Sequence, residues 1–358
     1  MSNEEEVIRL FLKSGYQISK KALPLILTDP EKIIQNISKL KPRPFIITEN
    51  HAKKILSPSG KTRIKVKVLK KYEFPKKEIT IDDYVKHLQT KYKKVRDILL
   101  ERMDKKKLIS INKITLQTKT FSIIGIVREK GENNVLLEDL SGEVLVFFDT
   151  IMKPKLKEIN LDDVIGVNCK RNKESFFVKI LYFPEIPSIR EINRSEEEIK
   201  IAFLFNLSLL TKKQKDLFNT NRSPSSVFIF TDDSKIMEES INPNLIKIPK
   251  DSPPTLFQLN KIKILILQKN PFKPLVNINF NFFTSILRKR CIFVPFNSKI
   301  CTGFDFVLEE TPDIIVSNFD INLHKNYKGA TIISNSDPNK YFLINLKTRE
   351  VVEKSIKS

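Results

Sequence analysis

The sequence predicts a chain of several α+β domains, and three patterns along it lead to that prediction. Helical periodicity marks the N-terminal end, and five short strands with a helical segment after the third follow in the middle. Continuous apolar strands then alternate with polar stretches in the C-terminal half. At 358 residues, 41% of them hydrophobic, the chain is long enough for two or three globular domains with separate cores.

Residues 1–40 are predicted to form a small helical module. Apolar residues at helical spacing fall near Val7–Leu12 and again at Ile33–Leu40. Asp29 and Pro30 have the residue types of a helix start, and Lys41–Pro44 is expected to end the module. Residues 41–80 combine lysines, prolines and a short β-like run at 64–69, and we interpret them as a basic extended connector.

Residues 81–107 contain an amphipathic helix. Its apolar positions recur at intervals of three and four from Tyr84 to Met103, with Lys and Arg between them. Thr80 is the expected N-cap, and Asp83 stands three residues later, as in a capping box.

Residues 108–187 are predicted to form a five-stranded barrel of the OB type. The expected strands are 119–128, 134–140, 143–148, 164–169 and 176–182, with a short helical piece at 151–159. Ser141-Gly142 has the residues of a hairpin turn between the second and third strands. Five strands with a helix after the third is the order of an OB barrel, and a plain five-stranded β-domain is the alternative.

Residues 188–358 are predicted to form a layered α/β or β-sandwich domain. Its expected strands are apolar throughout, which is typical of strands buried on both faces. They are 200–205, 226–230, 262–267, 291–295, 313–316, 330–334 and 341–346. No phosphate-binding glycine loop and no GxSxG elbow occurs, so nucleotide-cradling and nucleophile-elbow chemistry have no candidate residues.

The net charge of +21 suits a polyanionic partner, although a generally charged surface is the alternative. Residues 41–107 hold 21 Lys and Arg against 8 Asp and Glu, which favours a specific basic segment. The candidate nucleic-acid-binding residues are Lys61, Arg63, Lys65, Lys67, Lys70, Lys71, Lys91, Lys93, Lys94 and Arg96. For the helix lysines, a solvated charged face explains the pattern about as well.

The sequence gives no sign of export, membrane insertion or a cofactor. Three cysteines without CxxC spacing imply neither a disulfide framework nor a zinc site. The N-terminus lacks the basic region of a secretion signal, and no apolar run reaches the length of a membrane helix. We therefore expect a cytoplasmic, nucleoid-associated protein with no membrane partner.

The order of these segments resembles the small subunit of archaeal DNA polymerase D, within the B-subunit family of replicative polymerases. The stretches that carry the resemblance are 82–103, 121–130, 136–148, 162–169, 180–187, 309–318 and 327–336. The resemblance covers nearly the full chain. It implies a helical module, an OB barrel and a calcineurin-like phosphoesterase domain over 188–358.

Active members of that family carry histidine-rich metal motifs, and this chain departs from them. The degenerate metal-motif positions are Asn206, Ser208, Asp232, Asn318 and Asp320. The chain has three histidines, of which only His324 lies in the C-terminal half. A two-metal hydrolase needs imidazole and carboxylate ligands from several loops, so we expect no bound metal and no 3′→5′ exonuclease activity.

Two functions therefore compete on the sequence alone. The first is a non-catalytic scaffold subunit of a replicative DNA polymerase, with the polymerase D large subunit or a B-family polymerase as its catalytic partner and DNA as a further contact. The second is a stand-alone single-stranded nucleic-acid-binding OB protein. Most aromatic residues of the barrel segment fall in apolar runs, which favours the scaffold. We expect residues 108–358 to suffice for the subunit contact.

Overall fold

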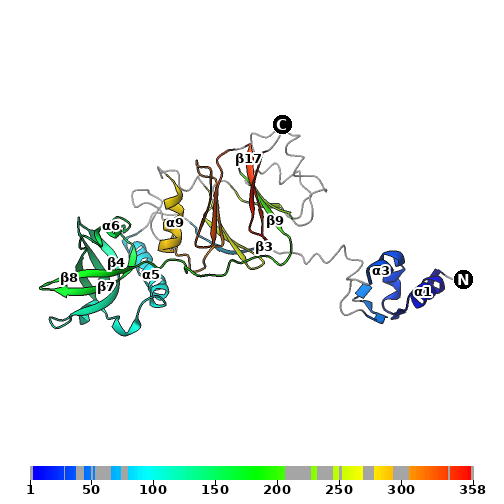
Figure 1. Ribbon diagram of the computed structural model, residues 1–358, viewed down its shortest axis with the longest axis horizontal. Coiled ribbons are helices and arrows are strands. Elements are labelled where there is room, and N and C mark those ends of the chain that lie inside the picture. The colour runs from blue at the N-terminus through cyan, green and yellow to red at the C-terminus, as the bar shows by residue number, and fades with distance from the viewer. Residues whose placement is uncertain are drawn as a thin grey trace. The chain divides into compact units, whose positions relative to one another are not determined.

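The computed structural model describes most of the chain, and it divides the chain into two compact units, Met1–Lys65 and Val66–Ser358. These are called the N-terminal and C-terminal units, and each is described by itself (Figure 1). The described residues are 3–27, 29–37, 44–49, 51–52, 66–73, 80–205, 227–231, 245–249, 252–268, 278–292, 306–337 and 339–355.

In its described residues, the N-terminal unit packs the helices α1, α2 and α3 against a two-stranded parallel sheet. Its elements are α1 (Asn3–Lys13), β1 (Gln17–Ile18), α2 (Leu23–Ile26), α3 (Pro30–Ile37) and β2 (Ile46–Ile47). Gly15 turns the chain after α1 with a φ of +81°, a left-handed conformation that glycine adopts without steric cost. The core includes Phe11, Ile26, Ile33 and Ile37, as the helical spacing predicts.

The sequence suggested that the module ends at Lys41–Pro44, but the structure extends it beyond these residues. β2 pairs with β1, and Ile47 and Ala52 are buried in the same core as the helices. A two-residue strand is too short to show a period in the sequence, so this closing segment could not be separated from the connector.

The barrel of the C-terminal unit is closed, with the strand order β4-β5-β6-β8-β7. Its strands are β4 (Thr120–Lys130), β5 (Asn134–Asp139), β6 (Gly142–Phe147), β7 (Val164–Asn172) and β8 (Ser175–Tyr182), and α6 (Lys153–Leu156) follows β6. The third and fifth strands, β6 and β8, form its parallel pair. The predicted OB order is therefore present, and Asp139 Oδ1 accepts the N–H groups of Ser141 and Gly142 in the predicted turn.

Helix α5 (Ile81–Leu100) docks on the barrel through its apolar face. Thr80 and Asp83 form the predicted capping box. Leu88, Tyr92 and Val95 pack with barrel residues, and the Tyr92 hydroxyl donates to the Ile124 carbonyl at 3.2 Å. Two 3₁₀ turns, Lys105–Lys107 and Ile111–Lys113, lead from the helix into β4.

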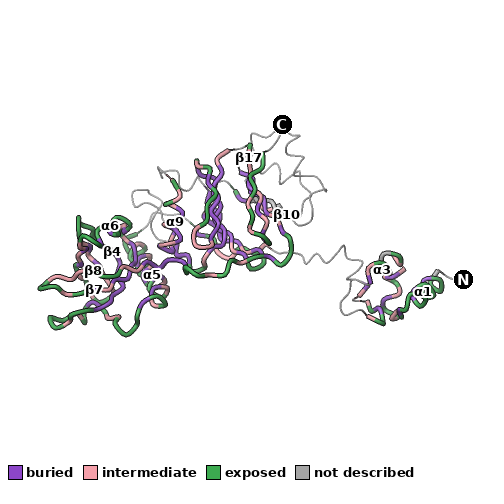
Figure 2. The backbone as a smooth tube through the Cα atoms, in the orientation of Figure 1, coloured by how far each residue is buried: buried purple, intermediate pink, exposed green. Residues whose placement is uncertain are grey.

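Two mixed sheets build the remainder of the C-terminal unit. The five-stranded sheet has the order β11-β10-β9-β17-β18, and the six-stranded sheet β15-β16-β14-β13-β12-β3. Their strands are β3 (Val66–Lys71), β9 (Lys200–Leu204), β10 (Val227–Thr231), β11 (Leu245–Lys247), β12 (Thr255–Leu259), β13 (Ile262–Leu267), β14 (Ile314–Ser317), β15 (Leu323–Tyr327), β16 (Ala330–Ser334), β17 (Lys340–Asn345) and β18 (Val351–Ser355). Figure 2 shows buried residues along the central strands of the six-stranded sheet, such as β14 and β16.

Helix α9 (Phe280–Lys289) covers part of the six-stranded sheet. Phe283, Ile286 and Leu287 are buried with sheet residues, and Phe282 meets Phe319 edge to face with ring centroids 5.7 Å apart. Phe280 and Phe282 are partly buried and pack against the same core.

The predicted connector 41–80 contains a strand of the sheet. β3 pairs antiparallel with β12 at the edge of the six-stranded sheet. It was interpreted as a connector because its partner lies far along the chain. A fragment that begins at residue 108 lacks both β3 and α5, so Val66 is the better start for an isolated core.

Only part of the predicted strand 291–295 lies in the described residues. There Cys291 forms a single bridge to Val307 rather than a strand.

Candidate functional site

One of the predicted metal-motif positions, Asn318, lies at one edge of the six-stranded sheet, directly after β14. β13, β14 and β16 run parallel to one another, so their carboxyl ends meet at the same edge. Gln268, Ser317, Asn318, Ser334 and Asn335 stand at these ends, and we call them the carboxyl edge. In open parallel sheets this is the edge where ligands bind.

At the carboxyl edge, amides and hydroxyls stand in place of carboxylates and imidazoles. The Asn318 amide donates to Gln268 Oε1 at 2.6 Å, and the Asn335 amide donates to the Lys340 carbonyl at 2.6 Å. Gln268 Nε2 and Ser317 Oγ are buried and have no hydrogen-bond partner among the residues that the structure describes. A neutral amide is a weak ligand for a catalytic divalent ion, whereas an unpartnered buried polar atom costs stability.

The remaining metal-motif positions do not complete a site in the described residues. Asp320 is exposed, and His324 on β15 lies beside Phe342 with ring centroids 6.3 Å apart. Within the described ranges, no group of three or more His, Cys, Asp and Glu side chains is placed to hold a metal ion. Asn206, Ser208 and Asp232 lie outside the described residues.

A buried ion pair joins the barrel to the sheets. Lys289, at the end of α9, reaches Asp163, just before β7, at 2.6 Å, with side chains 8% and 5% exposed. Asp163 also accepts the backbone N–H of Asn160 at 2.7 Å. Burial lowers the pKa of Lys289, and the Asp163 carboxylate opposes that shift.

Glu185, on the segment leaving the barrel, is the centre of a second set of contacts. Its carboxylate accepts the Tyr327 hydroxyl at 2.9 Å and pairs with Lys328 at 3.0 Å. Its backbone carbonyl accepts Arg102 Nη1 at 2.9 Å, which ties in the end of α5. These contacts and the Asp163–Lys289 pair together are called the junction, because they join barrel, helix and sheets.

The segment that leaves the barrel after Glu185 is also held by Asp313, which is fully buried at the amino end of β14. Arg190 Nη2 donates to one carboxylate oxygen at 2.5 Å, and Asn193 Nδ2 donates to both oxygens at 3.1 Å. The chain between barrel and sheets is therefore anchored rather than a loose linker.

The predicted nucleic-acid-binding residues fall into two groups. Lys70 and Lys94 both pair with Glu309, at 3.4 and 2.6 Å, and Lys91 donates to the Asp162 carbonyl at 2.7 Å. These three side chains make contacts within the C-terminal unit. Four others have exposed side chains: Lys67, Lys71, Lys93 and Arg96. Lys61, Arg63 and Lys65 lie outside the described residues.

Two phenylalanines remain on the outer face of the barrel. Phe121 and Phe148 are buried, and Phe176 packs edge to face on Phe121. Phe147 and Phe177 are register partners on β6 and β8, are partly exposed, and have ring centroids 5.9 Å apart. They are the barrel aromatics best placed to stack with a ligand, and their strand alternation was the signal that could have separated them from the core.

Comparison with known proteins adds little to these observations. No family model and no curated protein matches the chain. The solved structures similar to part of it include the S. pombe Stn1–Ten1 complex, at 22% identity and a TM-score of 0.19 over 21% of this chain and 72% of that one. The S. pombe telomere capping protein Ten1 has 22% identity and a TM-score of 0.19 over 21% of this chain and 77% of that one. The E. coli hypothetical protein ygiW has 13% identity and a TM-score of 0.18 over 21% of this chain and 86% of that one.

The barrel assignment therefore rests on the strand order. In the part of the chain that the structure describes, no helix is long and apolar enough to span a membrane.

Proposed function

We propose that this chain is a non-catalytic accessory subunit of a replicative DNA polymerase, a scaffold that binds the catalytic subunit. The observation that supports this most directly is the junction. A buried pair such as Asp163–Lys289 is costly to desolvate and holds its two elements in one geometry. A barrel fixed in this way to two sheets presents a single rigid surface, which suits a docking role.

The composition of the carboxyl edge supports the non-catalytic part of the proposal. We interpret the two sheets as an inactivated calcineurin-like phosphoesterase domain whose ligand positions have become amides and hydroxyls. Hydrolysis at a metal centre needs ligands that hold the ion and lower the pKa of its bound water. The Asn318–Gln268 pair supplies neither a carboxylate nor an imidazole.

Purification of the tagged full chain from its native cells, with identification of the chains that copurify, tests the partner. We expect a polymerase catalytic subunit, either the polymerase D large subunit or a B-family polymerase. The 66–358 fragment should recover the same subunit, because it keeps β3, α5 and the junction. Recovery of nucleic acid without any polymerase subunit would contradict the proposal.

The second candidate is a single-stranded nucleic-acid-binding protein, and the partly exposed Phe147–Phe177 pair favours it. Stacked bases and contacted phosphates would use these rings and the exposed Lys67, Lys71, Lys93 and Arg96.

Fluorescence anisotropy with oligo(dT) tests this candidate. Binding should weaken with salt by a log–log slope of about −0.7 per contacted phosphate. Replacing the four exposed basic residues with Gln should flatten that slope, whereas Lys155→Gln with Lys157→Gln, both exposed near α6, should leave it unchanged. Binding that is independent of salt would contradict this candidate.

A further inference from the structure

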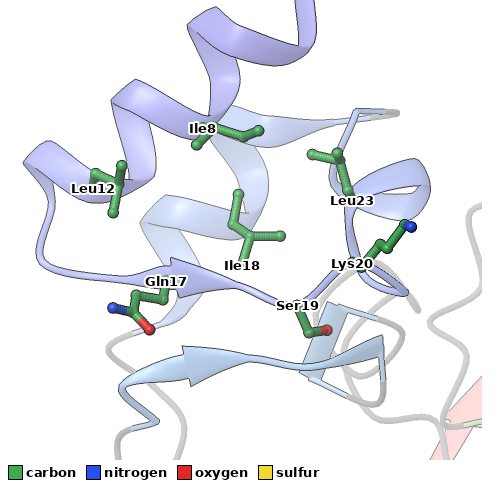
Figure 3. A pocket seen from close by; sticks show the side chains of 7 residues that line it. All are labelled: Ile8, Leu12, Gln17, Ile18, Ser19, Lys20 and Leu23. Carbon is green, nitrogen blue, oxygen red and sulfur yellow. The ribbon is translucent and has the colours of Figure 1, made fainter.

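The N-terminal unit carries a groove that the proposed function does not use. It has a volume of about 350 Å³ and lies between α1, β1 and the start of α2. Figure 3 shows the seven side chains that line it, which are Ile8, Leu12, Gln17, Ile18, Ser19, Lys20 and Leu23.

Two apolar side chains of α1 line the groove and are not part of the buried core. Val7 and Phe11 are buried in the core, while Ile8 and Leu12, one turn apart, are 36% and 55% exposed. Ile18 and Leu23 complete the apolar lining from the other side of the groove. Apolar side chains gathered in a concave surface mark an interaction site more often than scattered ones do.

The groove also holds an open strand edge. The N–H groups of Gln17 and Ser19 donate to the Phe45 and Ile47 carbonyls, both at 3.0 Å, where β1 pairs with β2. Alternate residues of a strand direct their backbone groups to opposite sides, so the N–H and C=O of Ile18 are turned away from β2. In the described residues this sheet has two strands, which leaves that side of β1 as an edge.

The positive charge in the lining favours a partner that carries a negative charge. Lys20 is the only charged side chain among the seven, so none of the described lining residues carries a carboxylate. Gln17 and Lys20 lie toward opposite ends of the groove in Figure 3. A carboxylate of the partner would find its complement at the Lys20 end.

We propose that the groove binds an extended peptide segment of a partner protein, with alternating apolar side chains and an acidic residue, which adds to β1 as a third strand. An extended segment places every second side chain on the apolar floor and pairs its backbone with Ile18. A helix would fill the floor but leave the edge of β1 unpaired, so the open edge decides between them. This site is separate from the surface proposed to bind the polymerase.

Fluorescence anisotropy on the full chain tests the site with a labelled peptide, acetyl-Ser-Val-Ser-Val-Ser-Asp-Ser-amide, whose valines and aspartate lie on one face of the extended chain. Two control peptides have the same sequence, but one is N-methylated at every odd-numbered amide and the other at every even-numbered amide. Both keep the side chains and the charge, and each loses the backbone N–H groups on one edge of the strand. We expect the first peptide to bind with a Kd below about 1 mM, and at least one N-methylated peptide to bind about tenfold more weakly.

Leu12→Asp should weaken binding by about tenfold or more, whereas Leu10→Asp should retain it within about twofold. Leu10 is the matched control because it lies on the same helix, is 42% exposed and does not line the groove. Unchanged circular dichroism spectra verify that both variants fold.

Three results would overturn the proposal: no binding at about 1 mM peptide, equal binding by all three peptides, or equal binding by the two variants. A Leu12-dependent dimer of the full chain in light scattering would assign the groove to a second copy instead. Because the 66–358 fragment lacks the groove, failure here leaves the polymerase copurification result unaffected.

Discussion

The junction and the carboxyl edge both bury polar side chains, but they differ in how those side chains are partnered. At the junction, Asp163 pairs with Lys289 and accepts a backbone N–H, and Glu185 contacts Tyr327 and Lys328. At the carboxyl edge, Gln268 Nε2 and Ser317 Oγ have no partner in the described part of the chain. Buried polar groups are normally satisfied, and an exception calls for an explanation.

The difference indicates that the junction, and not the carboxyl edge, has the bonding of a structural contact. The junction has the complete bonding of a contact that holds two regions together. Among the described residues, the carboxyl edge has incomplete bonding, because two of its buried polar atoms find no hydrogen-bond partner there. Folding tolerates the second because the core beneath it remains apolar.

The largest expected effect comes from breaking the junction. Asp163→Ala removes the carboxylate that pairs with the buried Lys289 ammonium, and it should lower the free energy of unfolding of the C-terminal unit by about 3–5 kcal/mol. Urea unfolding of the full chain measures this. Glu132→Ala removes an exposed partner of Lys153 and should cause no measurable change. Equal stability of the two variants would show that the junction does not hold the unit together.

A second substitution tests the contact of α5 with the barrel. A Cβ on Gly166 would overlap the Met103 sulfur, so Gly166→Ala should destabilise the C-terminal unit by about 1–3 kcal/mol in thermal unfolding. Gly142→Ala is the control, because its Cβ would meet Ile111 at an ordinary 3.6 Å. If the Gly166→Ala and Gly142→Ala variants have the same melting temperature, Met103 does not pack against Gly166 as described.

The third prediction concerns alkaline pH at the junction. Burial, together with the Glu185 carboxylate, raises the pKa of Tyr327 from 10.0 to about 12. The folded state therefore keeps a proton that the unfolded state releases. The contribution of Tyr327 is complete below pH 10 and is lost as the pH rises towards 12.

Urea midpoints measured from pH 8 to 11.5 should fall more steeply for the wild type than for Tyr327→Phe. Tyr84, whose pKa burial also raises to about 12, is present in both proteins, so the difference reports Tyr327. Parallel pH profiles would argue against a buried Tyr327–Glu185 contact.

The smallest expected effect has the opposite sign and lies at the carboxyl edge. Ser317→Ala removes a buried hydroxyl without a partner in the described ranges and should be neutral or stabilising by up to about 1 kcal/mol. Its register partner Ser334 donates to the Phe319 carbonyl, so Ser334→Ala should destabilise by about 0.5–1.5 kcal/mol. Chemical unfolding distinguishes the two, and a clear loss in Ser317→Ala would mean that its hydroxyl is used.

Local patterns predicted the barrel well. Each of its strands alternates or is bounded by turn residues, and the five predicted strands all overlap the observed ones. In the two mixed sheets, the strands that were not predicted are β3, β11, β12, β15 and β18. Of these, β3, β15 and β18 are edge strands with exposed polar residues, and β3 finds its partner β12 only in the folded chain.

The candidate site was harder to predict than the fold. The basic residues were visible in the sequence, but Glu309, which engages Lys70 and Lys94, lies 239 and 215 residues away from them. The missing histidines of the carboxyl edge could be seen directly. The pairing of Asn318 with Gln268 spans 50 residues and needs the fold.

The claim that this chain acts by binding rather than by hydrolysis is tested most directly by a nuclease assay. Pure full chain is incubated with Mn²⁺ and an end-labelled single-stranded oligonucleotide, beside an Asp232→Ala/Asp320→Ala variant prepared in the same way. A metal hydrolase needs imidazole and carboxylate ligands, and the chain has Asn206, Ser208 and Asn318 at positions that we propose to be degenerate metal motifs. We therefore expect no Mn²⁺-dependent shortening by either protein. Robust Mn²⁺-dependent shortening by the wild type that is absent in the variant would contradict the account.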